Sequence, residues 1–179
     1  MGTRHLVCVK LHGEYKISQF GSMGGQPQAA GVGCLRHLKA ILLDVEQFKR
    51  QLNWVELVQA DEDGPYDEDV QVVIPAHTAL NLINTAESKI KFYPSIEYAG
   101  EYSCEWVYVI DLDDNSFKVY KGRNKDESKE AKEFSQYVPE NNLGYRAVTL
   151  LNKYDLDNLP NIDDFKQYYE KIERDEADE

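Results

Sequence analysis

Two positions in this sequence combine a side chain that can attack a carbonyl group with a neighbour that could assist it. Cys104 precedes Glu105, so a thiol lies beside a carboxylate that could orient a base. Thr3 precedes Arg4, whose guanidinium could hold an anion. A nucleophilic Cys also needs a base, usually His, and the sequence alone brings none of the four His residues next to it. These residues permit amide hydrolysis but do not form a complete catalytic motif.

The surroundings of Cys104 also fit a structural role. Alternation along a strand beginning near residue 102 places Cys104 and Trp106 on one face and Glu105 on the other. An unpaired intracellular Cys is usually buried and inert, so the pattern favours Cys104 and Trp106 as core residues. Glu105 is the unusual residue, because an inward carboxylate with a shifted pKa would indicate a functional site. The structural question is whether Arg4, Gln19 and Glu105 converge on one pocket.

The Gly-rich segment 21–33 invites comparison with phosphate-binding loops. It has no Lys-containing phosphate-loop motif, and Arg36 stands where a dinucleotide-binding motif would have its third Gly. We therefore expect a loop between a strand and a helix, at the mouth of a pocket. Gly24 and Gly25 in this loop are binding candidates, together with Arg4 and Gln19.

Neither a metal nor a cofactor is predicted. Cys34 and His37 share one face of a helix, but no second pair of ligands with suitable spacing accompanies them. Residues 111–115 begin like a calcium loop, yet Ser116 replaces the required Gly and Gly122 the required Glu. A hairpin turn explains residues 111–115 fully.

The net charge of −12 is concentrated in two segments of the 179-residue chain. Residues 61–69 contain six acids and no base, and residues 154–179 have a net charge of −7, so the remainder is close to neutral. Such a chain lacks the basic surface that nucleic acids and anionic membranes bind, and neither is expected as a partner. Charge runs are usually solvated surface. An alternative is that these carboxylates imitate phosphates, as in a phage-type inhibitor of a nucleic-acid-binding protein.

The positions of these residues depend on a pattern of hairpins and helices. Apolar periodicity and turn residues predict strands at 4–11, 14–21, 102–112, 116–121 and 145–151, and helices at 32–52, about 76–90 and from Asn161 onward. Antiparallel hairpins grouped apart from helices indicate a single α+β layered domain over residues 1–173, followed by a frayed acidic tail at 174–179. The three Cys residues and the lack of a signal peptide or long apolar run favour a cytoplasmic protein.

Several segments resemble one sequence family. The opening MGTRHL, then GEYKISQFG, CEWVYVIDLD, FKVYKG and the closing LDNLP look like a family of fungal, bacterial and phage proteins with no established activity. The resemblance spans nearly the whole chain and supports a single domain. Members carry an aromatic and an acid in the loop after Q-[FY]-G, where this chain has Ser22-Met23-Gly24-Gly25.

The element order is also similar to that of N-terminal-nucleophile hydrolases, which implies an α-β-β-α sandwich as one form of the fold. In those enzymes the nucleophile becomes residue one and its own amine is the base. Removal of Met1 here would expose Gly2, so Thr3 would need a further cleavage.

The function expected first is therefore a non-catalytic binding module for a protein or a small molecule. An amide hydrolase with Thr3 or Cys104 as nucleophile and a nucleic-acid-mimicking inhibitor are the two alternatives.

Overall fold

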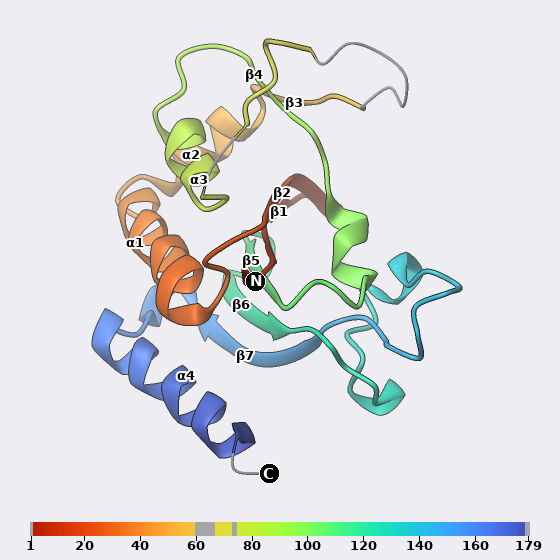
Figure 1. Ribbon diagram of the computed structural model, residues 1–179. Coiled ribbons are helices and arrows are strands. Elements are labelled where there is room, and N and C mark those ends of the chain that lie inside the picture. The colour runs from red at the N-terminus through yellow and green to blue at the C-terminus, as the bar shows by residue number, and fades with distance from the viewer. Residues whose placement is uncertain (1, 60–66, 73–74, 178–179) are drawn as a thin grey trace.

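The computed structural model describes residues 2–59, 67–72 and 75–177. A five-stranded sheet in the order β2-β1-β5-β6-β7 forms its centre (Figure 1). Its strands are β1 (His5–Leu11), β2 (Glu14–Gly21), β5 (Trp106–Asp111), β6 (Ser116–Lys121) and β7 (Thr149–Asp155). β1 and β5 are parallel and the other neighbours antiparallel, so the sheet is mixed.

The two predicted hairpins are confirmed, and one side chain joins their turns. His12 and Gly13, which connect β1 to β2, both have positive φ, as tight two-residue turns require. The Asp113 carboxylate in the β5–β6 turn accepts hydrogen bonds from the backbone N–H groups of His12 (2.7 Å) and Gly13 (2.8 Å). These two bonds, led by Gly13, lower the pKa of Asp113. The parallel pairing of β1 with β5 brings the two turns together at one end of the sheet.

The helix predicted over residues 32–52 is two helices, α1 (Val32–Ile41) and α2 (Val45–Leu52). A π-helical turn at Pro27–Gly31 leads into α1 from the Gly-rich loop. The break has a local cause, because Asp44 leaves the helical conformation and its side chain accepts a hydrogen bond from Gln47 N at 3.0 Å. Asp therefore caps a new helix instead of continuing the old one.

The remaining elements differ from prediction mainly in their bounds. α3 covers Thr78–Asn84, and the chain then forms β4 (Ile90–Phe92), which pairs in parallel with β3 (Val55–Leu57). The strand expected at 145–151 begins four residues later, as β7. Asn161 caps α4 (Ile162–Ala177), with its Oδ1 accepting from Asp164 N at 2.8 Å. Of the predicted tail at 174–179, residues 174–177 belong to α4, and residues 178–179 lie outside the described residues.

Both faces of the sheet are buried, by different kinds of structure. The helices cover one face, where side chains such as Val9, Tyr108 and Phe117 belong to the larger core cluster. Irregular segments cover the other, where Cys8, Val109 and Tyr120 belong to a second cluster. These segments include 3₁₀ turns at Ile96–Gly100, Glu127–Lys129 and Ser135–Tyr137; a further 3₁₀ turn, Leu156–Asn158, follows β7. Figure 1 shows α1 and α4 on one side of the sheet and the irregular segments on the other.

The α+β class is confirmed, with helices packed on a mixed sheet. Its layers differ from the α-β-β-α sandwich that the element order suggested. The described residues contain one large sheet, and the second sheet has only the three-residue strands β3 and β4. Within the same residues, no helix is long and apolar enough to cross a membrane.

Candidate functional site

Three residues that the sequence analysis singled out line one hollow, which we call the Arg4 pocket. It has a volume of about 460 Å³ and includes Thr3, Arg4 and Glu105. Gly2, Tyr102, Ser103, Arg123 and Tyr145 complete its lining. Segments about a hundred positions apart in the sequence therefore meet here, directly before the parallel strands β1 and β5.

The register of these strands places Arg4 beside Glu105. His5 pairs with Trp106, so the residues before each strand are neighbours too. The Arg4 carbonyl accepts hydrogen bonds from Glu105 N (3.0 Å) and Trp106 N (3.3 Å), and Arg4 N donates to Glu105 Oε1 (3.4 Å). The sheet thus fixes the backbone under the pocket, while the Arg4 side chain remains exposed.

Arg123 enters the pocket because the chain passes very close to Cys104 after β6. Gly122 N donates to the Glu105 carbonyl at 2.8 Å, and a Cβ at Gly122 would collide with the Cys104 carbonyl. Arg123 follows with φ of 57°, a left-handed conformation that is uncommon for a residue with a side chain. Its guanidinium lies 3.5 Å from Glu105 Oε2. Strained backbone of this kind is often found at binding sites.

The outer wall of the Arg4 pocket is aromatic and cationic. The rings of Tyr102 and Tyr145 lie 5.9 Å apart and are tilted by 33°. Lys125 Nζ lies 4.7 Å from the centre of the Tyr145 ring, a cation–π contact. Arg123 is balanced by Glu105, but the Arg4 guanidinium has no ion pair or hydrogen bond among residues 2–59, 67–72 and 75–177. Within the described part of the chain, the lining of the pocket therefore has two cations and one carboxylate, on a strongly acidic protein.

Thr3 lies in this pocket, but the described part of its lining offers no His as a base. The Thr3 carbonyl accepts a hydrogen bond from Gly25 N at 3.0 Å, which fixes the backbone against the Gly-rich loop. The nearby His5 ring is fully buried and neither ring nitrogen has a hydrogen bond to a described residue. Burial lowers the pKa of His5 to about 4, against a smaller opposing effect of the Thr3 carbonyl.

Cys104 is not placed to act as a nucleophile. It is fully buried, its thiol donates to the Trp106 carbonyl at 3.5 Å, and burial raises its pKa to about 12. The expectation of a core residue is correct, but the expected face is wrong. Cys104 packs in the cluster under the irregular segments, whereas Trp106 packs under the helices. Strand alternation does not apply to Cys104 because β5 begins only at Trp106.

Gln19, Gly24 and Gly25 do not join the Arg4 pocket. Gln19 is buried and its Nε2 donates to the Tyr93 carbonyl at 3.0 Å, so it connects β2 to the segment after β4. Gly25 also has a structural role, since its carbonyl accepts a hydrogen bond of 2.7 Å from the Tyr108 hydroxyl. Gly24 lines a separate hollow of about 400 Å³ with Gln28, which agrees with a loop at the mouth of a pocket.

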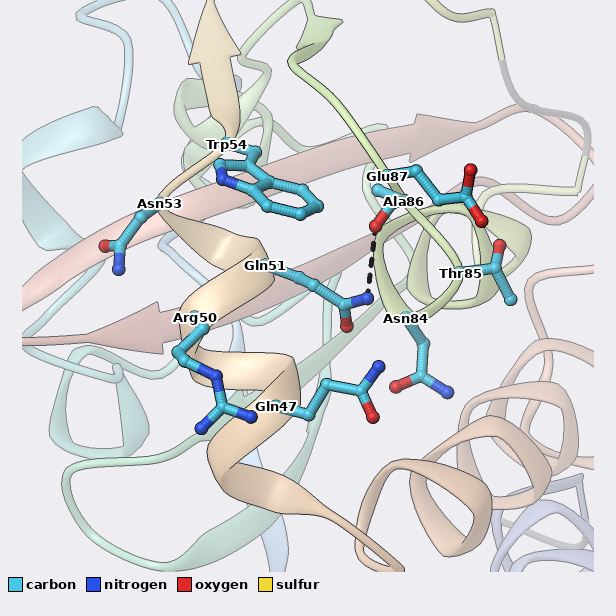
Figure 2. Close-up of a pocket in the computed structure, with 9 residues that line it drawn as sticks. All are labelled: Gln47, Arg50, Gln51, Asn53, Trp54, Asn84, Thr85, Ala86 and Glu87. Carbon is cyan, nitrogen blue, oxygen red and sulfur yellow. Dashed lines mark hydrogen bonds between the residues drawn. The ribbon is translucent and has the colours of Figure 1, made fainter.

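A larger hollow, of about 780 Å³, lies between the end of α2 and the segment after α3. We call it the amide pocket, because four side-chain amides line it: Gln47, Gln51, Asn53 and Asn84. Figure 2 shows Gln51 pointing across the hollow toward Ala86, and Gln47 and Asn84 extending toward one another from opposite walls. The Trp54 indole extends above Gln51 and is 40% exposed.

Sequence patterns did not predict a role for Arg123, Tyr102 or Tyr145, nor did they predict the amide pocket. A Gly directly after a strand was the available signal for Arg123, since such a Gly often marks a close approach of two backbones. The amide pocket gave no signal, because scattered Asn and Gln residues look like ordinary surface.

Among the described residues, no group of three or more His, Cys, Asp or Glu side chains could hold a metal ion. Comparison of the chain with protein-family models, with curated proteins and with solved structures found no match.

Proposed function

We propose that this protein is a non-catalytic binding module and that its Arg4 pocket takes a small anion carrying a flat ring. The observation that carries the proposal is the Arg4 guanidinium, which has no ion pair with a described residue and lies beside the Glu105–Arg123 ion pair. Arginine holds carboxylates and phosphates through paired N–H donors, and Tyr102 and Tyr145 add aromatic surface for a ring. Glu105 accepts hydrogen bonds from donor groups on the ligand.

Lack of an assembled nucleophile supports a binding role over catalysis. Cys104 is buried with a raised pKa. No His is in the described lining of the pocket that holds Thr3, and the Glu105 carboxylate there is paired with Arg123. A binding pocket needs only fixed polar groups around a hollow. The parallel register of β1 and β5 supplies that fixed backbone.

Phenyl phosphate, inorganic phosphate and benzyl alcohol separate the contributions of charge and ring. Calorimetric titration of the full chain should give the highest affinity for phenyl phosphate, then inorganic phosphate, then benzyl alcohol. The ³¹P NMR spectrum of phenyl phosphate should be unchanged after incubation with the protein, because the pocket binds it without hydrolysis. Arg4→Ala should weaken phenyl phosphate binding at least about tenfold. Arg50→Ala, in the other pocket, is the matched control and should leave it unchanged. Equal affinity in the Arg4→Ala variant, or no binding of any probe, would overturn the proposal.

The hydrolase alternative keeps one supporting observation, which is that Thr3 lines the same pocket as Arg4. It requires a mature chain that begins at Thr3, with a free amine as base. Intact-mass spectrometry of the protein from its native host measures this directly. A chain that begins at Met1 or Gly2 removes the alternative.

A further inference from the structure

The amide pocket is separate from the Arg4 pocket and has a different chemistry. Its polar side chains are mostly neutral amides, which both donate and accept hydrogen bonds. The formal charges in its lining, Arg50 and Glu87, cancel. Figure 2 shows Arg50 at the outer edge of the hollow and the Glu87 carboxylate turned away from Gln51. Its walls therefore suit an uncharged polar ligand.

One buried acceptor in this pocket has no donor among the described residues. Gln51 is 6% exposed, and its Nε2 donates to the Ala86 carbonyl at 3.2 Å. A carbonyl only accepts, so this bond fixes the amide with its nitrogen toward Ala86. Gln51 Oε1 then lies on the other side, buried and without a hydrogen bond among the residues that the structure describes. Buried acceptors without donors are rare, because leaving one unpaired costs stability.

The backbone around the aromatic wall is held from two sides. Trp54 N donates to the Gln51 carbonyl at 3.0 Å, and the Trp54 carbonyl accepts from Ile90 N at 3.0 Å. The Trp54 backbone is therefore attached both to the end of α2 and to the β3–β4 sheet. Phe48 and Leu52 of α2 are buried in the larger core cluster. This wall is thus built on packed elements, as a preformed site requires.

We propose that the amide pocket binds a neutral saccharide. One face of a pyranose ring is lined by C–H groups and packs on an aromatic ring, and the Trp54 indole supplies that surface. Hydroxyls around the sugar donate and accept in turn, which matches side-chain amides on opposite walls. A sugar hydroxyl donates to Gln51 Oε1 and satisfies the unpaired acceptor.

The pocket fits a saccharide better than a nucleotide. A nucleotide brings a phosphate, and the pocket has no surplus cation to hold it because Glu87 offsets Arg50. A base also presents hydrogen bonds only along its edges, whereas the amides here come from opposite walls. This inference is independent of the proposed function of the Arg4 pocket.

The two tryptophans allow a test with an internal control. Trp54 lines the pocket, whereas Trp106 is 4% exposed and packs edge-on against Tyr169 of α4. Glucose, galactose, N-acetylglucosamine, cellobiose and chitobiose are titrated into ¹⁵N-labelled full-length protein. At least one should shift the Trp54 indole N–H and the Gln51 side-chain amide saturably in the millimolar range, with the Trp106 indole unmoved.

Two variants distinguish binding from folding. Trp54→Ala should weaken saccharide binding at least about tenfold. Gln51→Met removes the acceptor at similar volume, and should lose binding without a loss of melting temperature. No saturable shift with any of the five sugars, unchanged affinity in Trp54→Ala, or adenosine monophosphate displacing the sugar from this pocket would each overturn the proposal.

Discussion

The Arg4 pocket and the amide pocket differ in how their polar groups are satisfied. In the Arg4 pocket the carboxylate of Glu105 is paired with Arg123, and the exposed Arg4 guanidinium has no partner among the described residues. In the amide pocket, the buried oxygen of Gln51 is the group without a described donor. An exposed cation is stabilised by water and attracts anions over some distance, whereas a buried oxygen needs a direct donor. The first pocket should therefore depend on salt and the second on shape.

The largest expected effect comes from Gly122, which packs against the backbone of Cys104 and Glu105 beside the Arg4 pocket. A Cβ there would collide with the Cys104 carbonyl, so Gly122→Ala must separate two backbone segments. We expect a loss of about 3 kcal/mol in the free energy of unfolding, measured by urea denaturation. Phenyl phosphate binding should fall with it, while the chain that remains folded should keep saccharide binding.

Gly13→Ala is the control for Gly122→Ala. Gly13 has φ of 75° but nothing within 4 Å of a Cβ, so only conformational strain opposes the substitution. Gly13→Ala should lower the free energy of unfolding by about 1 kcal/mol and leave ligand binding in both pockets unchanged. Equal costs at Gly13 and Gly122 would contradict the close approach described for Cys104.

Acid should affect the region beneath the Arg4 pocket through His5. Its folded-state pKa of about 4 lies below the usual 6.5, so the unfolded chain binds more protons between these values. The contribution of neutral His5 to the free energy of unfolding is complete above pH 6.5. As the pH falls toward 4, up to about 3 kcal/mol of this contribution is lost. Urea denaturation across this range should show a smaller pH dependence for His5→Gln than for the natural sequence. If the free energy of unfolding fell equally steeply with pH in the variant and the natural sequence, groups other than His5 would cause the acid sensitivity.

Salt should separate the two pockets. Raising sodium chloride from about 50 to 500 mM should weaken phenyl phosphate binding severalfold, because the Arg4 side chain is exposed and its charge is screened. Saccharide binding in the amide pocket should change by less than about twofold over the same range. Calorimetry at the two concentrations measures both. An equal loss of affinity for phenyl phosphate and for the saccharide would indicate that the amide pocket also binds its ligand through charge.

The smallest expected effect concerns the stability of the amide pocket. Gln51→Met should raise the free energy of unfolding by up to about 1 kcal/mol, because it removes an unpaired buried acceptor while keeping the volume. Gln47→Met, on the exposed side of α2, should change it by less than about 0.5 kcal/mol. A clear loss of stability in Gln51→Met would mean that the bond to Ala86 outweighs the unpaired oxygen.

Local sequence patterns were sufficient for much of the sheet and its helices. The turn at His12-Gly13 and the apolar runs around it predicted the first hairpin, and Asn161 predicted the start of α4. These patterns gave a wrong prediction where the local preference of one residue was stronger than the periodicity around it. Apolar periodicity ran through residues 32–52, but Asp44 competed for the backbone and divided the helix.

Residue types by themselves determined the charge distribution, the α+β class and the short list that contained Arg4 and Glu105. Tertiary structure alone decided that these two meet, because their contact depends on the register of parallel strands whose partners are a hundred residues apart. It also decided that Gln19 lies elsewhere and that Cys104 is buried. Burial and the partners of a polar atom are set by what packs around it. Such long-range packing is not encoded in the spacing of neighbouring residues.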